Sequence, residues 1–138
     1  MKKTIRESIH APYSLHDMNV TAFEVIGNTL RMRTHSGMVA TMPPYGQPDG
    51  YVEFHEVQWD FSYVYLLSHT GNVGTFTGKK MFLIDFIAEH PAPNFCVMDE
   101  TYGYHATKYS GYITIAGEFH EGFIEIYHEG DMVFITEE

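Results

Sequence analysis

The chain has 138 residues and carries eight Lys and Arg residues against eighteen Asp and Glu, which gives a formal net charge of −10. This length predicts a single domain spanning residues 1–138. Because nucleic acids and anionic membranes are bound through Lys and Arg, the charge argues against both. It leaves a basic protein, a cation or a neutral small molecule open, and we expect a basic or neutral protein partner.

The compartment is predicted from what the sequence lacks. No apolar run reaches the length of about 18 residues that crosses a membrane, and no signal-peptide core follows Lys2 and Lys3. A single cysteine, Cys96, allows no internal disulfide. We therefore expect a cytoplasmic protein.

Aromatic residues, at 15% of the chain, are the main deviation in composition and favour strands over helices. In chain order, the first predicted strands are Asn19–Ile26 and Thr29–Thr34, joined by a turn at Gly27-Asn28. A further turn leads into a third strand, Met38–Met42. Short strands joined by glycine-containing turns indicate an antiparallel meander.

A loop and a long alternating segment follow. Residues 43–50 hold three prolines and two glycines and are predicted to form a loop. In Tyr51–Ser68 the odd positions from Val57 to Leu67 are all apolar or aromatic. This alternation predicts one long strand in which Trp59 is buried, with a bulge or bend near Asp60–Ser62.

The second half of the chain predicts more strands and one helix. A short strand is expected around Val73–Phe76, and the spacing of apolar residues near 81–90 favours a short helix, although alternation there also fits a strand. The remaining predicted strands are Asn94–Asp99, Tyr109–Ile115, Phe123–His128 and Met132–Thr136. Eight or nine short strands with one helix predict a mainly β, antiparallel fold that forms a barrel or a sandwich.

The segment 100–112 is the most informative part of the sequence. It reads Glu-Thr-Tyr-Gly-Tyr-His-Ala-Thr-Lys-Tyr-Ser-Gly-Tyr and places four tyrosines beside a histidine, a lysine and a carboxylate. Tyrosines grouped in a connecting segment suit a recognition surface, although the same residues could brace a sheet. The candidate binding residues are Glu100, Tyr102, Tyr104, His105, Lys108 and Tyr109.

Patterns that indicate catalysis or metal binding are weak. The nine histidines are scattered, the closest pair is six residues apart, and no His-Glu-x-x-His occurs, so we assign no metal ligands. His16 and Asp17 are adjacent and would point to opposite faces of an extended chain. Tyr104 and Lys108 match the Tyr-x-x-x-Lys spacing of short-chain dehydrogenases, but the glycine-rich dinucleotide loop is missing. We therefore assign no catalytic residue and no cofactor.

A short motif recurs three times in the chain. It reads Phe-His-Glu at 54–56, Phe-His-Glu-Gly at 119–122 and Tyr-His-Glu-Gly at 127–130. Since each copy ends or flanks a predicted strand, we interpret it as a recurring way for the chain to leave a strand.

Two segments carry a resemblance. Leu15-His16-Asp17 ahead of a short strand, and the ending Ile124-Glu-Ile-Tyr-His-Glu-Gly-Asp131, resemble small uncharacterised bacterial proteins. The resemblance implies an independent cytosolic domain and transfers no catalytic residue.

The sequence favours a non-enzymatic domain, either protein-binding or regulatory and of the immunity type, that uses the segment 100–112. The alternative is a small-molecule pocket at the mouth of a barrel, with acid–base chemistry at Glu100, Tyr104, His105 and Lys108. A third interpretation assigns the aromatic residues only to the core and to a homodimer seam.

Overall fold

The computed structural model describes residues 1–67 and 77–137. The strands are β1 (Lys2–Ile5), β2 (Tyr13–Ser14), β3 (Asn19–Ile26), β4 (Thr29–Thr34), β5 (Val39–Ala40), β6 (Gly50–Phe54), β7 (Tyr63–Leu67), β8 (Gly78–Phe82), β9 (Asn94–Tyr102), β10 (Ala106–Ile115), β11 (Glu118–Tyr127) and β12 (Met132–Thr136). The helices are a 3-10 helix, η1 (Trp59–Phe61), and an α-helix, α1 (Leu83–Glu89). The mainly β fold with one short α-helix is confirmed, with more strands in the described residues than expected.

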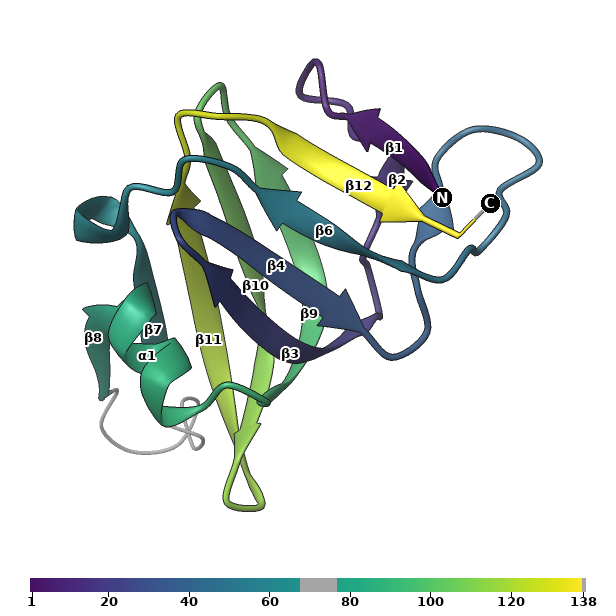
Figure 1. Cartoon of the computed structure of the whole chain (residues 1–138). Coiled ribbons are helices and arrows are strands. Elements are labelled where there is room, and N and C mark those ends of the chain that lie inside the picture. Colours follow the sequence, from purple (N-terminus) through teal and green to yellow (C-terminus); the bar gives the residue numbers. More distant parts are fainter. Residues whose placement is uncertain (68–76, 138) are drawn as a thin grey trace.

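Ten of these strands form one antiparallel sheet in the order β1-β12-β6-β4-β3-β9-β10-β11-β7-β8. The sheet folds over where β3 meets β9, because only two residue pairs, Asn19 with Cys96 and Val20 with Phe95, join these strands. The first half of the sheet consists of β1, β12, β6, β4 and β3, and the second half of β9, β10, β11, β7 and β8. Figure 1 shows the first half crossing in front of the second. The result is an open sandwich with β1 and β8 as its edges, and β2 and β5 pair separately.

The core lies between the two halves and follows from the alternation of apolar residues along the strands. The Phe54 ring of β6 meets the Tyr109 ring of β10 edge-on, with centroids 6.4 Å apart. Helix α1 buries Leu83, Phe86 and Ile87 in the same core. Its Phe86 ring meets Phe23 of β3 at 6.5 Å, so the helix packs between the halves. Each fully buried side chain of this size contributes about 1.5–3 kcal/mol.

The predicted long strand Tyr51–Ser68 is wrong. Its two ends are separate strands, β6 and β7, which belong to different halves of the sheet. Between them Glu56 takes a left-handed conformation (φ +51°), and the Phe61 amide donates to the Gln58 carbonyl at 3.0 Å to close the turn of η1. The turn coincides with the predicted bend, and it leaves Trp59 half-buried instead of buried in a strand.

Some of the other predicted elements agree with the structure and some do not. The bounds of β3, β4 and β12 match the predictions, and α1 confirms the helix near 81–90, although a strand, β8, precedes it. The predicted strand Met38–Met42 is present only as β5, Val39–Ala40. It pairs with β2 and does not continue the meander, because β4 has β6 as its next neighbour. The predicted strand Val73–Phe76 lies outside the described residues.

The tyrosine-rich segment 100–112 is mostly strand and is not a connecting loop. Strands β9 and β10 extend into it from both sides and leave only residues 103–105 as a turn. Pairing of Tyr102 with Thr107 and of Glu100 with Tyr109 fixes the register. Because successive residues of a strand face opposite sides, the candidate residues are divided between the two faces of the sheet.

Candidate functional site

Several loops meet at one end of the sandwich, near the upper end of the molecule in Figure 1. Backbone hydrogen bonds join them: Arg6 N donates to Met132 O at 3.0 Å, His128 N to His105 O at 2.8 Å, and Gly130 N to His55 O at 3.0 Å. Between the loops lies a cleft of about 640 Å³, lined by residues 5–9, 103–105 and 128–132. The cleft is therefore built from three parts of the chain that are distant in sequence.

The β9–β10 turn presents an aromatic pair at the rim of this cleft. The Gly103 amide donates to the Ala106 carbonyl at 2.7 Å, which closes the turn. Tyr104 at its tip is 90% exposed, and its ring lies 4.1 Å from the ring of His105. The candidate binding residue Tyr104 is thus exposed at the rim of the cleft.

Arg6 fastens the N-terminal segment to this turn. Its Nη2 donates to the Gly103 carbonyl at 2.9 Å and its Nη1 to the Ser8 carbonyl at 2.6 Å. The guanidinium also lies 4.9 Å from the centroid of the Tyr102 ring, a cation–π distance. The charge of Arg6 is therefore directed at backbone carbonyls and a ring, and it forms no ion pair among the described residues.

Three exposed carboxylates line the cleft, those of Glu7, Glu129 and Asp131, and the exposed Glu56 belongs to the neighbouring turn. We call the region of these four residues the acidic end. None of the four joins an ion pair in the part of the chain that the structure describes. Two of them belong to the recurring motif, and the Glu129 amide donates to the Glu56 carbonyl at 3.0 Å. Unneutralised carboxylates close together create a negative potential that attracts cations.

His128 forms the buried floor of the cleft. It is 1% exposed, its Nδ1 lies 3.0 Å from the Gly130 carbonyl, and its Nε2 lies 3.0 Å from Thr107 Oγ1. Burial lowers the pKa of His128 because the charged imidazolium is poorly solvated there. The neutral ring donates from Nδ1 and accepts at Nε2, so its role is to hold the β11–β12 turn.

Three of the predicted binding residues face inward and act as a brace. Glu100 accepts hydrogen bonds from Ser14 Oγ at 2.8 Å, from the Leu15 amide at 2.5 Å and from the Tyr102 hydroxyl at 3.1 Å. Burial, reinforced by the negative charge of Glu100, raises the pKa of both Tyr102 and Tyr109. These phenols stay neutral in the physiological range, and Glu100 holds the segment around β2 against β9.

Lys108 lies on the opposite, outer face of the sheet. Its Nζ pairs with Glu125 at 2.9 Å beside a second groove of about 390 Å³. The structure therefore brings Tyr104 and His105 together at the cleft and separates them from Lys108 and from the inward-facing Glu100. The four residues of the alternative pocket do not line one cavity, because alternation along β9 and β10 directs them to different surfaces.

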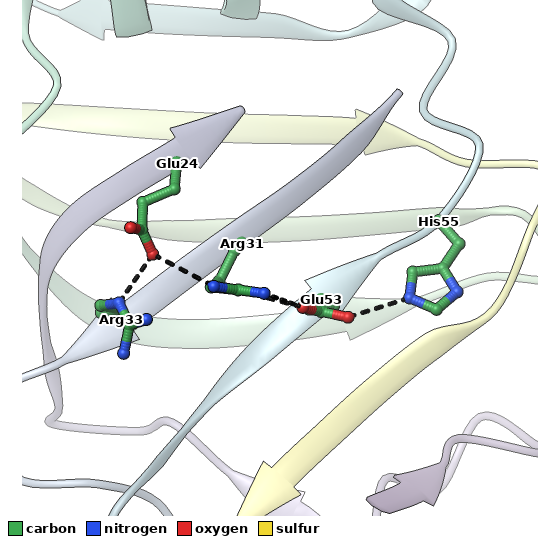
Figure 2. A network of polar contacts seen from close by, with 5 residues as sticks. All are labelled: Glu24, Arg31, Arg33, Glu53 and His55. Atoms are coloured by element: carbon green, nitrogen blue, oxygen red, sulfur yellow. Dashed lines mark hydrogen bonds and ion pairs between the residues drawn. The ribbon is translucent and has the colours of Figure 1, made fainter. Parts of the chain in front are cut away.

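On the outer side of β3, β4 and β6 the charges are paired. Figure 2 shows the ladder on the outer side of β3, β4 and β6. Arg31 donates from Nε and Nη2 to Glu53 at 3.0 and 2.8 Å, and Arg33 Nε donates to Glu24 at 2.6 Å. His55 Nε2 lies 3.1 Å from the other oxygen of Glu53. Burial opposes ionisation of Glu53, but hydrogen bonds from His55 and Arg31 outweigh it and lower its pKa.

Sequence reasoning missed most of the cleft, in particular Arg6, Glu7, Glu129 and Asp131. Pairing of β1 with β12 brings the first and last strands together, and no local pattern predicts such a contact. The recurring motif was the one available signal. Its copies at 54–56 and 127–130 lie side by side through the bridge between Val57 and His128, whereas the copy at 119–122 lies within β11.

Among the described residues no group of three or more His, Cys, Asp or Glu side chains is arranged to hold a metal ion. The helices in this part of the chain are all too short or too polar to cross a membrane. Comparisons with protein-family models, with curated proteins and with solved structures find no match to this chain.

Proposed function

We propose that this chain is a non-enzymatic binding domain that receives a basic segment of a protein partner at its acidic end. One observation carries the proposal: unpaired carboxylates surround a cleft beside the exposed Tyr104. The net charge of −10 favours the same kind of partner, because long-range attraction accelerates the encounter of oppositely charged surfaces.

Aromatic side chains next to the cleft supply the apolar part of the binding surface. The His105 ring lies 6.5 Å from Tyr127, whose ring lies 6.0 Å from Phe61. Tyr127 is 38% exposed and Phe61 64%. Exposed aromatic rings stack on arginine and bury aliphatic side chains, so they suit a segment of alternating basic and apolar residues. A cytoplasmic regulatory domain of the immunity type is the class of protein that we infer.

The test is the affinity for defined peptides, measured by fluorescence anisotropy at low and at physiological salt. The probe is a peptide of alternating arginine and leucine, compared with a glutamate and leucine peptide of the same length. The site variant is Glu7→Gln/Glu129→Gln/Asp131→Asn. We expect the basic peptide to bind the unmodified chain, and its affinity to fall about tenfold in the variant, with a weaker salt dependence.

A matched control separates local from overall charge. Asp49→Asn/Asp85→Asn/Glu137→Gln removes the same number of carboxylates, all exposed, away from the cleft. We expect this control to bind as the unmodified chain does. Equal losses in the two triple variants would show that only net charge matters, and absence of any preference for the basic peptide would refute the proposal.

A further inference from the structure

The outer side of the second half of the sheet carries a band of aromatic side chains. We call it the aromatic face and define it by Tyr63, Tyr65, Phe82 and Phe123, which lie on β7, β8 and β11. Phe82 is 43% exposed, and the other three are half-buried. Helix α1 buries its apolar side between the two halves of the sheet and so does not cover the aromatic face. The 3-10 helix η1 touches only one side of this face, where the Tyr63 hydroxyl donates to the Asp60 carbonyl at 3.1 Å.

Strand register arranges this face in rows. One row crosses the strands as Lys80, Tyr65, Phe123 and Ser110, and the next as Phe82, Tyr63, Glu125 and Lys108. The rings of Tyr63 and Phe82 stack with centroids 5.4 Å apart, and those of Tyr65 and Phe123 meet at 6.3 Å. The rows thus place aromatic rings on the neighbouring strands β8, β7 and β11, with one lysine on each of the outer strands, β8 and β10.

The local charge of this face differs from that of the whole chain. Lys80 Nζ lies 4.0 Å from the centroid of Tyr63, and Lys108 pairs with Glu125. Asp99 of β9 continues the first row beyond Ser110, so the two rows hold two lysines and two carboxylates and are neutral in a chain of net charge −10. Two copies of such an acidic chain repel each other over most of their surfaces, and they repel least where the surface is neutral.

The rows of one copy are also complementary to the same rows of a second copy. A two-fold axis parallel to the strands, between β7 and β11, would set Tyr65 of one copy opposite Phe123 of the second. The same operation sets Phe82 opposite Lys108, and Tyr63 opposite Glu125. These contacts are an aromatic pair, a cation over a ring, and a tyrosine ring beside a carboxylate, with no like charges opposed. The groove of about 390 Å³ beside Tyr65 and Phe123 leaves room for side chains of the second copy to insert between those of the first.

We propose that two copies of the chain associate through the aromatic face. An interface core rich in Tyr and Phe and flanked by paired charges is typical of protein–protein contacts. The inference goes beyond the proposed function, because the acidic end lies at the ends of the strands and stays open. The axis would leave both acidic ends on the same side of the dimer.

The test is the mass of the full chain by sedimentation equilibrium over a range of concentrations. We expect the unmodified chain to show twice the 15.8 kDa of one copy. Phe123→Glu should shift the mass to that of a single copy. Because Phe123 is half-buried and its variant could unfold, Phe82→Glu on the exposed edge strand is the second variant, with circular dichroism to establish folding.

The control is Tyr104→Glu, which adds the same charge at the acidic end and should leave the mass doubled. A mass of 15.8 kDa for the unmodified chain at every concentration would overturn the proposal. So would a dimer that persists in both folded aromatic-face variants. Binding of the basic peptide by the folded Phe82→Glu chain is read out separately, so failure of one proposal is distinguishable from failure of the other.

Discussion

At the scale of single residues, Glu100 shows how a predicted binding residue can be structural. Its carboxylate accepts hydrogen bonds from Ser14, Leu15 and Tyr102 and so joins strands that are distant in sequence. The sequence alone identified a carboxylate among tyrosines. It could not show that the nearest donors come from residues 14 and 15, because that contact depends on tertiary packing.

We expect Glu100→Ala to destabilise the fold by about 1–3 kcal/mol, since it leaves the buried Leu15 amide without its acceptor. Glu100→Gln keeps an acceptor oxygen and should cost less. Urea denaturation of the two variants measures the difference. Equal free energies of unfolding for Glu100→Ala and the unmodified chain would show that the brace is dispensable.

His128 makes the fold sensitive to mild acid. Because the pKa of His128 is lowered in the fold, the unfolded chain takes up a proton first as pH falls below the ordinary value of 6.5. Stability should therefore fall by up to about 1.4 kcal/mol per pH unit below about pH 6.5, until the folded imidazole is protonated as well. The lowered pKa values of Glu53 and Glu125 act only below about 4.5, the ordinary value.

Urea midpoints between about pH 7.5 and pH 5 measure this effect. His128→Gln should flatten the pH dependence, whereas the exposed His35→Gln should retain it. A slope that survives in His128→Gln would assign the acid sensitivity to other groups.

At the scale of elements, the alternation that predicted β3, β4 and β12 misled at Tyr51–Ser68. The alternation of apolar residues correctly indicates that β6 and β7 each have one buried side. It does not indicate that η1 interrupts the predicted strand between them. The left-handed Glu56 is not glycine, so the turn left no composition signal. The sequence therefore predicts that strands lie in this segment, but it does not predict that a turn divides them.

The variant Trp59→Ala distinguishes a tryptophan buried in a continuous strand from one that is half-buried in η1. A tryptophan buried in a central strand would cost about 3–5 kcal/mol when truncated. Because Trp59 is half-buried in η1, we expect about half of that loss. If urea denaturation showed a loss of unfolding free energy near the upper end of the range for a buried tryptophan, Trp59 would stabilise the fold more than its exposure indicates.

Both edges of the sheet carry lysines. Lys2 and Lys3 lie on β1, and Lys79 and Lys80 on β8. Lys79 is opposite the buried Leu66 and so projects from the inner side of the edge, where a charge opposes the addition of another strand.

We expect Lys79→Val to aggregate faster on storage, by light scattering, while Lys79→Arg behaves as the unmodified chain does. Equal stability of the two variants against aggregation would show that the backbone of β8 is protected by other means.

At the scale of the whole molecule, composition predicted the class of fold, and the candidate site depended on contacts that composition does not report. The sequence shows that cations are few, but it does not show that Arg31 joins the charge ladder, that Arg6 binds the β9–β10 turn and that Lys108 lies on the outer face of the sheet. As a result Tyr104 could be named as a candidate from the sequence, and the cleft beside it could not.

Charge also governs solubility. The chain has nine histidines and a pI near 5.2, so acidification cancels much of the charge of −10 as imidazoles protonate. We expect turbidity to be greatest near that pH and to clear on return to neutral pH. A clear solution across the whole range would show that local pairing, and not net charge, keeps the chain dispersed.

Pairing of Lys2 with Thr136 has a topological consequence. Since β1 and β12 are neighbours, the two chain ends lie side by side (Figure 1). A short linker would close the backbone into a ring, and new ends could be opened at the β10–β11 turn, where Ala116 and Gly117 are exposed. Such a circular permutant would keep every strand neighbour while the order of the strands along the chain changed.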